Sequence, residues 1–180
     1  HPSAQYMVGT CYYHGQGVRK NFKEAIKYYR LAANEGHAEA QYMVGYCYYH
    51  GQGVRKNYKQ AIKYYRLAAN QGYLRAQYMV GFCYYHGHGA GKDYKQAAKY
   101  FHLAAEQDHV RAQFRLGYFY FWGKGVKKNY QQAIKYFRLA ANQGDEDAQG
   151  WLGVCYYHGH GVGKNYKQAV KYYRLATQNN

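Results

Sequence analysis

The sequence predicts an all-α solenoid of five helix–turn–helix repeats, and three observations support this fold class. A period of 36 residues fills the 180-residue chain, with glycines in step at Gly45, Gly81 and Gly117. Alanine and leucine recur at the same period. Apolar residues are spaced by three and four rather than by two, which indicates helices rather than strands. Because one helix pair cannot bury its apolar face alone, we expect the units to stack.

The repeat also sets the expected domain organisation. We divide the chain into units 1–36, 37–72, 73–108, 109–144 and 145–180. In such arrays each unit contacts mainly its neighbours. We therefore expect residues 1–180 to form a single repeat domain.

The second unit shows how each helix is expected to begin and end. Helix A is predicted from Glu39 to Tyr49, and Gly51 can take the left-handed conformation that ends it. Helix B is predicted from Tyr58 to Asn70. Asn57 is a good N-cap for helix B, and Gln60, three residues later, is expected to complete a capping box.

The two helices carry different faces. Helix B has an apolar stripe on one side and basic residues such as Lys59 and Lys63 on the other. In helix A, Gly45 allows a neighbouring helix to come close. A second stripe of helix A is aromatic and is left over for another role; it consists of Tyr42, Tyr46 and Tyr49.

Charge and hydropathy limit the partners and the compartment. The chain has 25 Lys and Arg against 9 Asp and Glu, a net charge of +16, which favours acidic partners. No stretch approaches the roughly 18 consecutive apolar residues of a membrane span, so no transmembrane segment is expected. The N-terminus shows no signal segment, although a mature chain would have lost one.

The four cysteines share one repeat position, at which Phe119 replaces cysteine in the fourth unit. Equivalent positions in stacked helical units lie about 8–10 Å apart. A disulfide needs Cα atoms within about 7 Å. We therefore expect four free thiols, which favours a reducing compartment such as the cytoplasm or a host cytosol.

The recurring residues form a recognisable motif. It reads A-x-x-x-[VL]-G-x-x-Y-x-x-G-x-G-V, then N or D, then A-x-x-Y-[YF]-x-L-A-A, and it runs through all five units. This pattern resembles the Sel-one-like repeat family, a relative of the tetratricopeptide repeats. The resemblance implies a right-handed superhelix with A helices on its concave face and B helices on its convex face.

The resemblance also implies a class of function. Family members are mostly non-enzymatic scaffolds and adaptors that bind proteins, including bacterial proteins that interact with host or envelope components. Secreted, cysteine-rich members linked to penicillin binding carry paired cysteines at positions that are Ala69 and Gln77 here. The chain therefore does not match that subclass.

We expect the partner-binding surface to be an aromatic lane along the A helices. Tyrosine presents a large rigid surface at low entropic cost, and such residues are enriched in binding hot spots. The alternative is that these rings stack on one another between units. The predicted partner-binding residues are Tyr42, Tyr46, Tyr49, Tyr78, Phe82, Tyr85, Phe114, Arg115, Tyr118, Trp122 and Trp151.

Three of these residues, Arg115, Trp122 and Trp151, mark where later units depart from the repeat. Arg115 and Trp151 replace the methionine of the first three units, and Trp122 replaces a histidine. Arg115 and Trp122 are seven residues apart and share a helix face, and we expect Trp151 beside Arg115. An arginine between two tryptophans would anchor an acidic or aromatic group of a protein or peptide.

Other functions find less support in the sequence. The convex Lys and Arg ridge could bind nucleic acid or an anionic surface, but such sites pair charge with aromatic rings, which we expect on the opposite face. The pairs His86–His88 and His158–His160 lack the further ligands of a metal site, so no metal or cofactor is expected. No nucleophile–base pair with an orienting third residue is evident, and we expect no enzyme activity. Neither end carries an obvious polar capping helix, so we keep end-to-end or dimeric self-association as an alternative.

Overall fold

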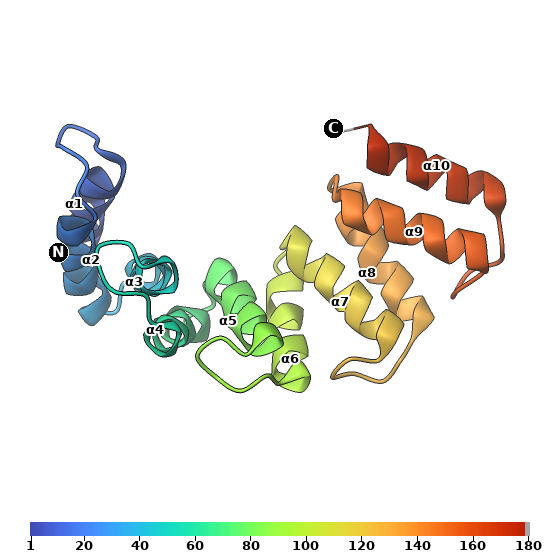
Figure 1. Ribbon diagram of the computed structural model, residues 1–180, viewed down its shortest axis with the longest axis horizontal. Helices are drawn as coiled ribbons and strands as arrows, with labels where there is room; N and C mark the ends of the chain where they lie inside the picture. The colour runs from blue at the N-terminus through green and yellow to red at the C-terminus, as the bar shows by residue number, and fades with distance from the viewer. Residues whose placement is uncertain (179–180) are drawn as a thin grey trace. The chain divides into compact units, whose positions relative to one another are not determined.

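The computed structural model describes residues 1–178 and contains ten helices and no strand in that range. The last two residues of the fifth predicted unit, Asn179 and Asn180, lie outside the described residues. The A helices and B helices alternate along the chain (Figure 1). The A helices are α1 (Pro2–His14), α3 (Ala38–His50), α5 (Leu74–His86), α7 (Val110–Trp122) and α9 (Glu146–His158). The B helices are α2 (Phe22–Asn34), α4 (Tyr58–Asn70), α6 (Tyr94–Ala105), α8 (Tyr130–Asn142) and α10 (Tyr166–Thr177).

The chain divides into two compact units between Asp93 and Tyr94. The first contains α1 to α5 and the second α6 to α10. Within each unit every helix packs against the next one in the chain. The all-helical fold class is therefore confirmed, whereas the expectation of a single domain and of a right-handed superhelix stays a prediction.

Local chemistry explains the helix boundaries. Gly51 ends α3 in the left-handed conformation, as expected. Helix α3 starts earlier than predicted because the ring Nδ1 of His37 accepts a hydrogen bond from the backbone N–H of Ala40. Asn57 caps α4 by accepting from the N–H of Gln60 at 3.1 Å. The predicted capping box is wrong, because the N–H of Asn57 donates to the carbonyl of Tyr48 and not to the Gln60 side chain.

Small residues let the layers approach closely. Gly45 lies against the ring of Tyr65, where an added Cβ would come within 2.7 Å of the ring. Gly53, in the loop after α3, has a φ of 71°, and an added Cβ would collide with the backbone carbonyl of Phe22 at the start of α2. Alanines fill the remaining contacts, and Ala25, Ala61 and their equivalents are fully buried.

The outer faces of the first and last helices are more exposed than their interior equivalents. Val44 is fully buried, whereas Val8, one repeat earlier, is 38% exposed. Ile62 is buried, whereas Val170 of α10 is 48% exposed. These faces have the residue types that other repeats cover. Association of the faces with a second copy of the chain stays a prediction.

Candidate functional site

In the first compact unit, which runs from His1 to Asp93, the predicted lane residues form a continuous aromatic belt. Tyr42, Tyr46 and Tyr49 of α3 are each half-buried. The Tyr42 ring lies 5.6 Å from the ring of Tyr65, and Tyr49 lies 4.9 Å from Tyr58. Burial raises the pKa of Tyr49 to about 12. These rings therefore also join α3 to α4.

The belt continues onto α5. Tyr78, Phe82 and Tyr85 are half-buried as well. Phe82 lies 6.3 Å from Tyr78 and meets Tyr49 of the preceding repeat edge-on at 6.4 Å. The Tyr49 hydroxyl is 2.8 Å from Nδ1 of His88, in the loop of the next repeat. Much of the lane in this unit thus packs one repeat against the next.

In the second compact unit, which begins at Tyr94, the predicted residues separate into buried and exposed groups. Phe114 is only 7% exposed and lies 6.1 Å from Phe137, so its ring belongs to the core rather than to a contact surface. Arg115 is half-buried, with its guanidinium 5.9 Å from the Phe114 ring centroid. Trp122, by contrast, is 52% exposed.

Three of the predicted residues meet in one cluster, which we call the tryptophan surface: Tyr118, Trp122 and Trp151. The two indoles lie 6.2 Å apart, nearly perpendicular to each other. Tyr118 is 6.3 Å from Trp122 and 5.7 Å from Trp151. Trp151 also stacks on Phe137 at 5.8 Å, which fixes its ring on the core. The cluster is a rigid aromatic platform with one edge in solvent.

Positive charge lies beside this platform. The Lys124 ammonium is 5.2 Å from the Tyr118 ring centroid, within the range of a cation–π contact. Lys124 occupies the repeat position at which other units have Gln52, His88 and His160. The sequence reading did not include Lys124, although its departure from the other units could have drawn attention to it.

A pocket of about 320 Å³ opens next to Trp151. Its lining includes Gly150 and Val154, at positions where the second to fourth units carry Tyr or Phe. Tyr173 of α10 and the carboxylate residues Glu146 and Asp147 complete the lining. The pocket lies where two aromatic rings are missing from the repeat. The sequence reading missed it, although both substitutions are visible in the alignment of the units.

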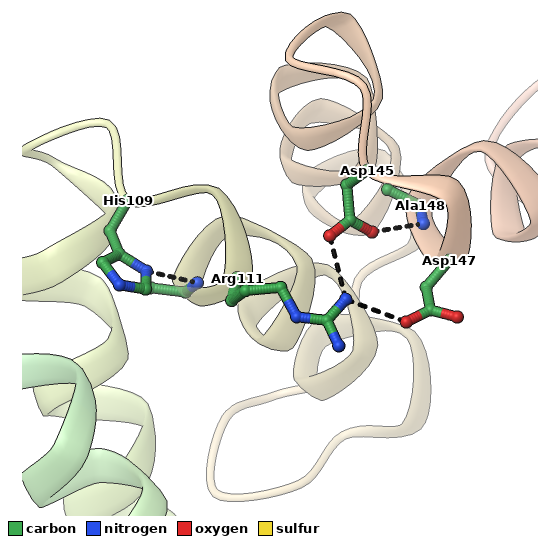
Figure 2. Close-up of polar contacts among 6 residues, drawn as sticks. His109, Arg111, Asp145, Asp147 and Ala148 are labelled. Atoms are coloured by element: carbon green, nitrogen blue, oxygen red, sulfur yellow. Dashed lines mark hydrogen bonds and ion pairs between the residues drawn. The ribbon is translucent and has the colours of Figure 1, made fainter. Parts of the chain in front are cut away.

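An ion-pair network connects the two helices that carry the tryptophans (Figure 2). Nη1 of Arg111, on α7, lies 3.0 Å from Asp145 and 2.9 Å from Asp147, at the start of α9. Asp145 is buried and also caps α9 by accepting from the N–H of Ala148 at 2.8 Å. Hydrogen bonding to Asp145 raises the pKa of the Arg111 guanidinium. The network holds α9 against α7 and so helps to position Trp151 beside Trp122.

The cysteines and histidines do not assemble a reactive centre in the described residues. Cys47, Cys83 and Cys155 are fully buried, and burial raises the pKa of each thiol to about 12. Burial therefore keeps these sulfurs in the unreactive thiol form. Within residues 1–178 no group of three or more His, Cys, Asp or Glu side chains is placed to hold a metal ion. No described helix is long and apolar enough to cross a membrane.

Helices that each pack against the next one along the chain, within each compact unit, place the protein among the helical-repeat scaffolds, the class to which tetratricopeptide-like proteins belong. The Sel1 repeat family matches residues 2–37, 38–73, 74–109, 110–145 and 146–180. The chain therefore belongs to the Sel1 repeat family, and the resemblance noted in the sequence is confirmed. Each matched segment begins one residue later than the corresponding unit drawn from the sequence.

Solved structures show the same fold. A protective antigen of uropathogenic Escherichia coli with an SLR fold is 34% identical, with a TM-score of 0.95 over 99% of this chain and 38% of that one. A Sel1 repeat protein from Oxalobacter formigenes is 37% identical, with a TM-score of 0.94 over 99% of this chain and 74% of that one. Cysteine-rich protein B of Helicobacter pylori is 30% identical, with a TM-score of 0.58 over 77% of this chain and 99% of that one.

This chain thus spans 38% of the length of the E. coli antigen. Comparison with curated proteins gave no match.

Proposed function

We propose that the chain is a non-enzymatic scaffold that binds a protein or peptide segment, and that the tryptophan surface and its adjoining pocket make the main contact. The observation that carries the proposal is the exposed Trp122 against Trp151, beside a pocket where the repeat lacks two rings. Trp is enriched in hot spots because a rigid, desolvated ring adds much contact area at low entropic cost.

The shape of the pocket favours an apolar or aromatic anchor in the ligand. An added Cβ on Gly150 would meet no atom within 4 Å, so the space above α9 is open. A partner's ring placed there would stand where Tyr42 and Tyr78 stand in the earlier repeats. The partner would therefore complete the aromatic pattern of the array.

Charges around the pocket would orient the ligand. Arg115 lies on α7 and Lys124 in the loop that follows it, against Tyr118 of the tryptophan surface, whereas Glu146 and Asp147 line the pocket with Trp151. An acidic group of the ligand would face Lys124, and a basic group would face the carboxylates. A peptide offers both groups along one chain, which supports a peptide segment rather than a simple polyanion as the ligand of this surface.

The comparisons support a setting for this binding. The similar E. coli protein is described as a protective antigen. We infer a partner among host or envelope components, with this chain acting as an adaptor. The penicillin-binding alternative finds no support in the residues, because the positions of the paired cysteines hold buried Ala69 and Gln77.

The test uses a library of displayed random peptides selected on the immobilised chain. The chain has two tryptophans and both belong to the tryptophan surface, so tryptophan emission reports directly on this site. We expect selected peptides to carry an aromatic residue and to shift the emission on titration. Trp122→Ala should weaken binding by about 10-fold or more, as expected for a hot-spot residue.

Tyr166→Ala is the matched control, because Tyr166 is another exposed aromatic of the same unit, 57% exposed on α10. This variant should bind the selected peptides as the wild type does. Selected peptides that bind without any change in emission, or that lose equal affinity with both variants, would place the binding site elsewhere.

A further inference from the structure

The B helices within each compact unit carry basic faces that are almost free of acidic residues. Helices α4, α6, α8 and α10 contain lysines, arginines or a histidine and no Asp or Glu. Lys59, Lys63 and Arg66 of α4 are all exposed. The positive charge of these faces is therefore not neutralised by neighbouring residues of the same helices.

Tyrosine pairs accompany these basic faces, which corrects the expectation that aromatic rings gather only on the other face. Each pair joins an A helix to the B helix of the same repeat, with the rings nearly parallel. The stacked pairs are Tyr12–Tyr28 at 5.8 Å, Tyr48–Tyr64 at 6.0 Å, Tyr120–Tyr136 at 5.8 Å and Tyr156–Tyr172 at 5.6 Å.

Cations from the preceding repeat reach these pairs. The Arg30 guanidinium donates to the Tyr48 hydroxyl and lies 5.4 Å from its ring centroid. Arg138 donates in the same way to the hydroxyl of Tyr156, at 2.9 Å. A combination of one arginine and a tyrosine pair thus occurs at the second and fifth repeats.

In the fourth repeat the Tyr120–Tyr136 pair lines a groove of about 670 Å³, which we call the basic groove, and His102 stands at the repeat position of Arg30 and Arg138. Its lining contains many hydrogen-bond donors and no carboxylate, although Glu106, outside the lining, pairs with His102 at 3.3 Å. Tyr120 is half-exposed, whereas Tyr136 is buried beneath it. The lining residues are His102, Tyr120, Val126, Lys127, Lys128, Asn129, Gln132, Lys135 and Tyr136.

We propose that the basic groove, with its equivalents in other repeats, binds the sugar–phosphate backbone of a single-stranded nucleic acid. Lysine, amide and hydroxyl donors are the groups that contact phosphates. A half-exposed ring beside such donors suits unpaired bases, which stack on aromatic side chains. The groove has no carboxylate to pair with the basic residues of a protein, which favours this ligand over a protein segment.

This groove is separate from the tryptophan surface. Tyr118 and Tyr120 are two residues apart on α7, and a helix turns about 100° per residue, so their side chains leave on nearly opposite sides. Binding at either surface can therefore be removed without the other.

The test measures fluorescence anisotropy of a labelled 24-nucleotide oligouridylate with the full chain. Three lysines line the basic groove. With about three phosphate contacts, affinity should fall about 20-fold between 50 mM and 200 mM salt. Lys127→Gln combined with Lys135→Gln should weaken binding at low salt about fivefold or more, and should lower the slope against log salt by about 1.4.

The charge-matched control is Lys23→Gln with Lys167→Gln, at the repeat position that is Gln131 in the repeat bearing the basic groove. This control should lose less than about twofold in affinity. An abasic strand of equal length should bind about threefold or more weaker than the oligouridylate, because ring stacking contributes to binding. The proposal is overturned by the absence of binding at low salt, by equal losses in both double variants, by equal affinity for the abasic strand, or by equal competition from polyglutamate.

Discussion

Tyr65→Phe is predicted to stabilise the protein, because the Tyr65 hydroxyl is buried without a partner. Tyr65 is fully buried, and its oxygen forms no hydrogen bond. Its ring packs on Gly45 and lies 5.6 Å from Tyr42. The equivalent residues in the next two repeats are Phe101 and Phe137, both fully buried, so a phenyl ring fits this position.

The expected gain follows from the cost of burying an unpaired polar group. Leaving a hydroxyl unsatisfied in the interior costs about 1–3 kcal/mol. Removing only that oxygen keeps the ring contacts, so we expect the free energy of unfolding to rise by about 1–2 kcal/mol. For a chain of this size the midpoint of thermal unfolding should rise by about 2–8 °C.

Urea and thermal unfolding followed by far-ultraviolet circular dichroism measure this change. Tyr29→Phe is the matched control, because the Tyr29 hydroxyl donates to Oγ1 of Thr10 at 3.4 Å. That variant loses a hydrogen bond and should be neutral or destabilised by up to about 1 kcal/mol. A loss of stability in Tyr65→Phe, or an equal gain in both variants, would refute the reasoning.

Alkaline pH gives a second readout of the same group. Burial raises the pKa of Tyr65 above its ordinary value of 10.0. Folding thus favours the neutral hydroxyl over the phenolate. Ionisation of Tyr65 leaves the free energy of unfolding unchanged below pH 10 and lowers it as pH rises further, because the unfolded chain then ionises at this residue while the folded chain stays neutral. The stability of the wild type should therefore fall more steeply above pH 10 than that of Tyr65→Phe.

Three further predictions concern packing and reactivity. Glu35→Gln should raise the free energy of unfolding by about 0.5–1.5 kcal/mol in urea titrations. At the position of Glu35, later repeats have a glutamine that donates to the glutamine equivalent to Gln5, whereas Glu35 leaves Oε1 of Gln5 unpaired. An unchanged midpoint would contradict this prediction. Gly45→Leu should destabilise by about 1–3 kcal/mol or more, since even a Cβ collides with the Tyr65 ring, and calorimetry showing no change would count against the close approach. Iodoacetamide should modify Cys11 first, because it is partly exposed while the other three thiols are buried, and mass spectrometry finding uniform labelling of the folded chain would argue against this order.

Much of the fold follows from local chemistry that is visible in the sequence. The bounds of α4 match the prediction because Asn57 supplies a side-chain cap that few other residues provide. The capping box failed because a backbone carbonyl from α3 occupies the N–H of Asn57, and the sequence does not show such a tertiary contact. The four free thiols follow from the repeat spacing, and the structure shows each of them unpaired.

The candidate site was predicted only in part, because the A helices carry apolar residues on nearly every side. Periodicity then cannot decide which ring faces a neighbouring helix, and Phe114 proved to be core while Trp122 is exposed. The stacked pair Tyr48–Tyr64 was missed for the same reason. The departures from the repeat were more informative. Trp122 and Trp151 lie in neighbouring repeats, and their rings meet in the structure.

The most direct measurement of the central claim is the affinity of a selected peptide for Gly150→Tyr, titrated by tryptophan emission. This change restores the tyrosine of earlier repeats and fills the pocket beside Trp151, at a position where an added Cβ is unobstructed. Gly163→Tyr is the control, because Gly163 is exposed in a loop of the same unit and its Cβ position is also open. We predict that Gly150→Tyr lowers the affinity about 10-fold or more while Gly163→Tyr leaves it unchanged. Undiminished affinity in a folded Gly150→Tyr would contradict binding at the tryptophan surface.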